Sequence, residues 1–206
     1  MQTAAHSPAH APFDGPGSRS ATRAIHVGPC SPLRPEAESF IRDIFHRHYG
    51  ALVSSIAPNL FVLEKHNGIA ATAGWRGADY DSLFLERYLD APIEAALENL
   101  TGQRVERRHI VEAGNLASRH AGGSVQVIIQ LARHLADQGY EWVVFTATRQ
   151  LIGIFTKLGL PLLALTKADP SRLGAEASEW GTYYKSEPVV VAGRIRLALE
   201  RNGAGA

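Results

Sequence analysis

The chain has 206 residues, of which 21 are Lys or Arg and 20 are Asp or Glu, so its formal net charge is +1. This balance disfavours a nucleic-acid-binding protein, because such proteins neutralise phosphates with a concentrated basic face. No segment approaches the roughly 18 consecutive apolar residues of a membrane-spanning helix. The hydrophobic content of 45% argues against a disordered chain, and the length favours one domain with a tail.

The first segment, residues 1–34, is rich in Ala, Pro, Gly, Ser and His and has few large apolar residues. We expect it to be a disordered tail, with an ordered domain at 35–199 and a flexible end at 200–206. It contains no apolar leader, so we expect a cytoplasmic location. Cys30 is the single cysteine, which excludes an intramolecular disulfide and a cysteine-based zinc site.

The first half of the expected domain begins with a helix after Pro35. Its apolar residues recur at helical spacing and Gly50 is a suitable end; they are Phe40, Ile41, Ile44, Phe45 and Tyr49. Two strand-like runs, 60–64 and 69–75, flank an Asn-Gly pair that predicts a hairpin. Helical pieces follow over 82–100, with a break near Pro92.

The second half alternates strands and helices. The pattern predicts a strand over 107–117 that becomes irregular at Gly114-Asn115, and then a helix over 125–139 that is apolar nearly all round and so largely buried. A continuous apolar strand at 141–147 should be covered on both faces. A helix at 149–160, a strand at 161–167, a loop with aromatics and a last strand at 188–195 complete the order. This succession predicts a single α/β domain with a mixed sheet.

A glycine-rich turn, Gly122-Gly123-Ser124, precedes the long helix. Backbone N–H groups at the positive end of a helix favour a phosphate, and glycines let the backbone approach it. Arg119 lies close enough along the chain to add charge. The alternative is an ordinary tight turn.

Two segments resemble GNAT-type N-acetyltransferases. Residues 119–124 (RHAGGS) resemble the pyrophosphate loop of that superfamily, with Ser124 at its second small position, and residues 155–160 (FTKLGL) resemble a later segment that often carries a tyrosine general acid. Thr156 occupies the position of that tyrosine here.

Longer segments resemble the thermostable hemolysin family, namely residues 49–51 (YGA), 83–94 (LFLERYLDAPIE), 110–118 (IVEAGNLAS) and 180–184 (WGTYY). Arg87 stands where that pattern has Gln. The family's sequence architecture resembles GNAT-type enzymes and acyl-homoserine lactone synthases. The resemblance therefore implies a GNAT-like mixed central sheet flanked by helices. It also implies transfer of an acyl group from acyl-CoA or acyl carrier protein to an amine such as an amino acid.

The resemblance also implies roles for individual residues on the fourth strand. Glu112 would take the proton of the attacking amine, and an apolar environment would raise its pKa; the alternative is a structural carboxylate that caps the turn or pairs with Arg119. Backbone N–H groups of Leu116 and Ala117 would hold the thioester carbonyl. Asn115 would contact ligand, or simply adopt the left-handed conformation. Glu86, a second candidate carboxylate, could instead be solvated or ion-paired.

Aromatic residues and one arginine form the expected substrate pocket. The acyl-homoserine lactone synthases imply a role for the N-terminal helix, here through Arg42, Phe45 and Tyr49. An apolar acyl pocket could be lined by Trp180, Tyr183 and Tyr184, or these residues could pack under the last strand. Trp75 and Trp142 should be core residues. The spacing of the histidines predicts no metal site.

Two other functions remain open at this point. The family name suggests a membrane-active hemolysin, although helix 36–49 has a narrow apolar face and a polar face that is not Lys-rich, and we expect no stable membrane insertion. A non-catalytic GNAT-like binding module is the other alternative, because Thr156 replaces the usual tyrosine.

Overall fold

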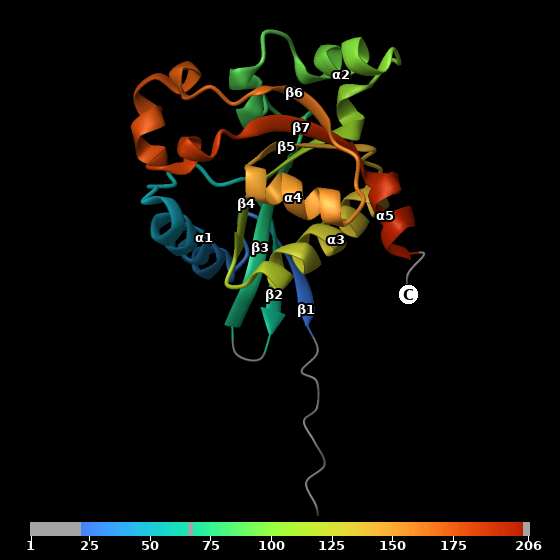
Figure 1. The fold of residues 1–206 in the computed structure, drawn as a ribbon. Helices are drawn as coiled ribbons and strands as arrows, with labels where there is room; N and C mark the ends of the chain where they lie inside the picture. Colours follow the sequence, from blue (N-terminus) through green and yellow to red (C-terminus); the bar gives the residue numbers. More distant parts are fainter. Residues whose placement is uncertain (1–21, 66–67, 204–206) are drawn as a thin grey trace, which may run out of the picture.

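The structure is a computed structural model, which describes residues 22–65 and 68–203. Its centre is a seven-stranded sheet with the order β1-β2-β3-β4-β5-β7-β6 (Figure 1). The strands are β1 (Arg23–Val27), β2 (Asn59–Lys65), β3 (Gly68–Gly77), β4 (Ile110–Ser118), β5 (Trp142–Ala147), β6 (Leu163–Lys167) and β7 (Val189–Arg194). Strands β4 and β5 are parallel and the other neighbours antiparallel, so the predicted mixed sheet is confirmed.

Helices cover both faces of the sheet. The α-helices are α1 (Arg34–Tyr49), α2 (Ile93–Thr101), α3 (Ala121–Asp137), α4 (Arg149–Lys157) and α5 (Ile195–Gly203), and the 3-10 segments are η1 (Phe84–Tyr88), η2 (Arg107–His109), η3 (Pro170–Trp180) and η4 (Tyr183–Ser186). Successive side chains of a strand point to opposite faces. On β2, Leu60 and Val62 pack with α1, whereas Phe61 and Leu63 pack with α3.

The same alternation on β5 assigns the remaining helices. Trp142 and Val144 pack with η1 and α2, whereas Phe145 packs with Phe155 of α4. Therefore α1, η1 and α2 lie on one face of the sheet, and α3 and α4 lie on the other, where α5 also contacts α3 (Figure 1).

The sheet splits between its two parallel strands. Their pairing runs from Ile110 opposite Trp142 to Glu112 opposite Val144, although β4 continues to Ser118 and β5 to Ala147. A bulge explains the divergence, because the β3–β4 register shifts between Thr72 and Gly74 and Asn115 has φ of 48°.

The bulge is held by specific contacts. The Asn115 side-chain oxygen accepts a hydrogen bond of 2.9 Å from the Ala57 backbone N–H. A Cβ at position 74 would lie 2.9 Å from that same oxygen and 2.8 Å from the Ala57 Cβ, so Gly74 allows this close approach. The left-handed conformation predicted for Asn115 is thus present.

The boundaries of the ordered domain differ from the prediction. Residues 23–27, placed in the disordered tail of 1–34, form β1 in register with β2, with Val27 fully buried. Pairing with a strand edge orders the backbone even where the side chains bury little area. At the other end α5 continues to Gly203, past the expected end of the domain at residue 199. Residues 1–21, 66–67 and 204–206 lie outside the described residues, and these include Asn67 of the predicted Asn-Gly turn.

Other predictions for individual elements are confirmed, except that residues 107–109, predicted as the start of a strand, form the 3-10 segment η2, and that the long helix differs in its burial. Gly50 ends α1 in the left-handed conformation with φ of 66°, and Trp75 and Trp142 are core residues. Helix α3 starts at Ala121 and is buried mainly along Val127, Leu131 and Leu135. The helix is therefore not buried on all sides, because a helix that packs on one face of a sheet contacts the core with one side only.

Candidate active site

A cavity of about 390 Å³ lies at the split between β4 and β5. On one face of the sheet it is lined by aromatic residues of α1, η1, η3 and η4, which are Phe45, Tyr49, Phe84, Tyr88, Trp180, Tyr183 and Tyr184. On the other face it is lined by apolar residues of α3, α4, α5 and β5, including Ile128, Leu131, Phe145, Ile154, Phe155 and Leu199. The divergence of the two strands therefore connects the two faces of the molecule through the sheet.

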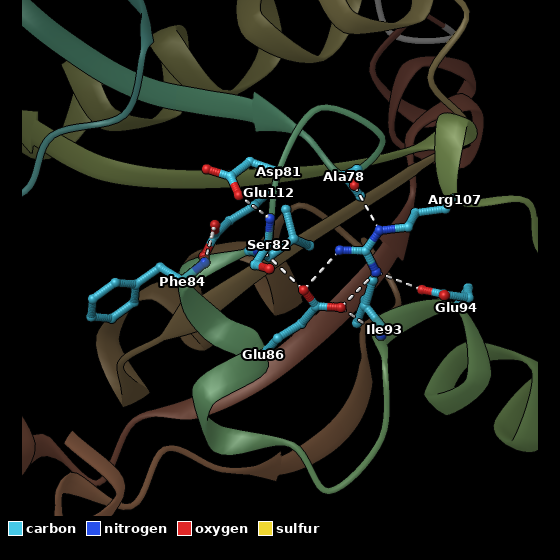
Figure 2. Close-up of polar contacts among 10 residues, drawn as sticks. Ala78, Asp81, Ser82, Phe84, Glu86, Ile93, Glu94, Arg107 and Glu112 are labelled. Carbon is cyan, nitrogen blue, oxygen red and sulfur yellow. Dashed lines mark hydrogen bonds and ion pairs between the residues drawn. The ribbon is translucent and has the colours of Figure 1, made fainter.

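Glu112 stands at the last paired position of β4, where the split begins. Its Oε2 accepts a hydrogen bond of 2.8 Å from the backbone N–H of Phe84 (Figure 2), and its Oε1 accepts one of 2.9 Å from the backbone N–H of Leu85. The residue is 8% exposed and lines the cavity. The carboxylate thus anchors the start of η1 and also borders the cavity.

The electrostatics of Glu112 combine opposing effects. Burial raises its pKa above the ordinary value of 4.5, while the Phe84 and Leu85 N–H groups and the charge of Arg76 act to lower it. A carboxylate offers about four lone-pair sites. The two backbone N–H groups occupy one site on each oxygen, and Arg76 forms an ion pair with Oε2, so a lone pair on Oε1 remains for a ligand proton.

Arg76 of β3 is a cavity residue that the sequence reasoning missed. The β3–β4 register places it directly opposite Glu112, and its Nε lies 3.4 Å from Glu112 Oε2. It is the single cation in a strand of otherwise small and apolar residues, which was an available signal. His48, Phe84 and Tyr88 also line the cavity without having been predicted.

The predicted aromatic residues come together as one wall. Ring centroids of Phe45 and Tyr49 lie 5.9 Å apart, those of Tyr49 and Tyr183 lie 5.2 Å apart, and Trp180 lies 5.4 Å from Tyr183. The Tyr184 and Tyr88 hydroxyls form a hydrogen bond. Burial raises the pKa of Tyr183 and of Tyr184, so both stay neutral and present rings to the cavity.

The glycine-rich turn is shaped by contacts with β4. A Cβ at position 123 would lie 2.5 Å from Ser118 Oγ, whereas one at position 122 would meet nothing within 4 Å. The N–H groups of Gly123 and Ser124 donate to the His120 carbonyl at 2.9 and 3.4 Å. Gly123 therefore permits close packing of the turn on β4, while Gly122 faces open space.

The other residues predicted around this turn divide into two groups. Asn115, Leu116, Arg119 and Ser124 line the cavity, whereas Ala117 packs in the core beneath α1. The Arg119 Nε donates to the Ile69 carbonyl at 3.1 Å, and its guanidinium lies 5.3 Å from the Phe40 ring centroid. These contacts direct the Arg119 guanidinium toward β3 and α1.

Glu86 lies apart from Glu112, in the middle of η1. Its two oxygens accept hydrogen bonds of 2.6 and 2.8 Å from the Arg107 guanidinium and of 2.9 Å from the backbone N–H groups of Leu83 and Ile93 (Figure 2). These contacts lower its pKa to about 2 despite partial burial. Glu86 does not line the cavity of the split; its carboxylate holds a loop together.

Arg42 and Thr156 also lie outside the cavity lining. Arg42 pairs with Glu38 at 2.9 Å, and the Thr156 hydroxyl donates to the Ile152 carbonyl on the exposed side of α4. Within the described ranges, no group of three or more His, Cys, Asp or Glu side chains could hold a metal ion. None of the described helices has the length and apolar character needed to cross a membrane.

The model of a sequence family described as thermostable hemolysin matches residues 27–199. No curated protein matches the chain.

Solved structures with the same fold include acyl-transferring synthases. The acyl-homoserine lactone synthase LasI superposes with a TM-score of 0.59 at 12% identity, over 87% of this chain and 95% of that one. FeeM, an N-acyl amino acid synthase from uncultured soil microbes, gives 0.58 at 11% identity, over 87% and 94%. BjaI, a CoA-dependent acyl-homoserine lactone synthase solved with SAM and isopentyl-CoA, gives 0.57 at 12%, over 87% of each chain. At these identities the likeness shows the fold, and the predicted GNAT-like fold is confirmed.

Proposed function

This chain belongs to the thermostable hemolysin family, and on that premise we propose that it is an N-acyltransferase that moves an acyl group from an acyl thioester to an amine. The observation that carries the proposal is the cavity through the split sheet. Its α3–α4 side is apolar, as an acyl chain requires, and its other side has a buried carboxylate among aromatic rings. The fold is shared with synthases that transfer acyl groups.

In the proposed reaction, the acyl thioester and the amine meet at β4, between the two sides of the cavity. The amine nitrogen attacks the thioester carbonyl carbon, a C–N bond forms, the C–S bond breaks and the thiolate leaves. Glu112 accepts the proton that the amine loses, because a neutral amine is the nucleophile. The raised pKa of Glu112 suits this role, since a stronger base takes the proton more readily.

The acyl donor is CoA or an acyl carrier protein, whose shared phosphopantetheine arm ends in the reactive thiol. We place this arm along the free edge of β4 beyond Glu112, with the Leu116 backbone beside the thioester and the turn at Gly122 and Ser124 near the phosphate. The open space at Gly122 and the lack of acidic residues in the first turn of α3 support this placement. Asn115 acts by holding the bulge, and Glu86 and Arg42 take no part in the chemistry.

Release of free thiol tests this function directly. Purified protein, mixed with acyl-CoA or acyl carrier protein and a panel of amines, should liberate thiol only when donor and acceptor are both present. A membrane-active hemolysin would instead empty dye-loaded liposomes without any donor, and a binding module would shift its melting temperature with CoA but release no thiol. Either of these results in place of turnover would contradict the proposal.

A further inference from the structure

The charges of the cavity lie almost entirely at one point. Of the lining residues in the described part of the chain, the Asp, Glu, Lys and Arg members are Arg76, Glu112 and Arg119. Arg119 is held by the Ile69 carbonyl near the glycine-rich turn. Arg76 and Glu112 thus form an isolated pair of opposite charges on the aromatic side of the split.

The pairing between Arg76 and Glu112 leaves part of the guanidinium unused. Arg76 approaches Glu112 through Nε at 3.4 Å, and within the described residues no hydrogen bond holds its terminal amino groups. Its side chain is 21% exposed and lines the cavity, so a ligand in the cavity can reach these donors. A guanidinium presents its donors as a planar fork that matches a carboxylate.

A ligand that carries both an ammonium and a carboxylate group on one carbon atom fits this pair. The ligand carboxylate would accept hydrogen bonds from the terminal N–H groups of Arg76. The ligand amino group would then lie beside the free lone pair of Glu112 Oε1. The pair and the ligand are each neutral overall, so binding buries no uncompensated net charge. Rings of Phe84, Tyr88 and Trp180 line the same side of the cavity and leave apolar surface for a side chain.

We infer that the acyl acceptor is an α-amino acid with an apolar side chain, whose free carboxylate is bound by Arg76. This inference rests on the proposed function and names its substrate class. Arg76 therefore selects the acceptor, while Glu112 removes its proton. The product would be an N-acyl amino acid whose carboxylate stays on Arg76.

Binding of the product provides a test that does not depend on the donor. We would titrate the protein with N-decanoyl-L-leucine and with N-decanoyl-L-leucinamide, which differ by one charge. The protein should bind the acid about 10- to 100-fold more tightly, as expected for a charge-assisted bidentate contact. Arg76→Gln should remove this preference, so that the acid binds as weakly as the amide.

Two further variants separate recognition from folding. Arg76→Lys keeps a positive charge beside Glu112 but loses the planar fork of donors. It should therefore bind N-decanoyl-L-leucine more weakly and bind N-decanoyl-L-leucinamide with unchanged affinity. Arg87→Gln removes an arginine that lies over Phe84 outside the cavity lining and should keep the full preference. Equal affinity for acid and amide in the original protein, or an undiminished preference in both Arg76 variants, would overturn the inference.

Turnover distinguishes failure of this inference from failure of the proposed function. Arg76→Gln should raise the KM for leucine about 10- to 100-fold and leave the KM for leucinamide unchanged. Thiol release that is equal for leucine and leucinamide would refute the role of Arg76 and leave the acyltransferase proposal intact. Absence of thiol release with every amine, together with Arg76-dependent binding of N-decanoyl-L-leucine, would refute the acyltransferase proposal and support the carboxylate site.

Discussion

Replacing Glu112 with Gln probes both the anchoring and the chemistry that the structure assigns to one carboxylate. The two oxygens accept separate backbone N–H groups, from Phe84 and Leu85. A glutamine amide offers one oxygen and one NH₂ group, so one backbone donor loses its acceptor and faces another donor. The lost hydrogen bond and the unsatisfied donor together cost about 2–3 kcal/mol. The melting temperature should then fall by about 4–12 °C, at about 2–4 °C per kcal/mol for a chain of this size.

Catalysis should fall much further than this loss of stability explains. A positioned general base contributes roughly 10²- to 10⁴-fold, so the kcat of Glu112→Gln should drop by that factor at a temperature where the variant is folded. The assay is thiol release at saturating donor and amine, with the folded fraction measured by circular dichroism. Glu86→Gln is the matched control, because Glu86 also anchors the η1 region through backbone N–H groups but lies outside the cavity. It should lose stability and keep its kcat.

The pH dependence of stability shows how the protonation state of the Glu112 carboxyl group affects the folded protein. Because burial raises the pKa of Glu112, the folded state holds its proton more tightly than the unfolded state. The stability advantage of the original protein over Glu112→Gln should therefore shrink as pH rises from about 4.5 through the raised pKa.

A Glu112→Gln variant whose kcat falls only in proportion to its folded fraction would refute Glu112 as the base.

Three other perturbations have expected outcomes. The pKa of Glu86 is lowered to about 2, so the stability that its ionised form contributes should be present above pH 4.5 and lost as pH falls toward 2; the difference in melting temperature between the original protein and Glu86→Gln should close over that range. Gly123→Ala should destabilise the protein by about 1–3 kcal/mol, because its Cβ would lie 2.5 Å from Ser118 Oγ. Adding Ser118→Ala removes this clash but also the hydrogen bonds between Ser118 Oγ and the His120 backbone, so the double variant should recover part of the lost stability, and Gly122→Ala should be neutral in denaturant titrations. Ile128→Phe narrows the apolar side of the cavity, so its kcat/KM should fall more for dodecanoyl-CoA than for hexanoyl-CoA, and equal losses would place the acyl chain elsewhere.

Much of the fold could be predicted because local patterns and tertiary packing agree. The 3.6-residue spacing from Phe40 to Tyr49 gave α1, and the Asn-Gly pair gave the β2–β3 hairpin. Strand β1 could not be read in the same way, because its ordering comes from hydrogen bonds to β2 rather than from its own side chains. The burial of α3 was overestimated because a run of apolar residues does not show that the helix lies on an outer layer.

In the candidate site, too, residues that belong to a family motif could be predicted, whereas contacts that depend on the folded structure could not. Glu112 and the aromatic residues near both ends of the chain were found through family motifs, and the fold brings them to one cavity. Glu86 carried the same kind of signal, but its contacts with Arg107 and two backbone N–H groups depend on a loop geometry that no motif encodes. Arg76 has no motif of its own, and its relation to Glu112 follows from the β3–β4 register, which only the folded structure reveals.

Mass spectrometry of small molecules from cells that express this chain tests the proposed acyl transfer most directly. Extracts should contain new N-acyl amines that are absent when the same amount of soluble Glu112→Gln protein is expressed. Their mass should equal that of an amine plus a fatty acid minus water, and their fragments should include the free amino acid. Identical extracts from the two strains, with both proteins folded, would contradict the conclusion that the split sheet transfers acyl groups to amines.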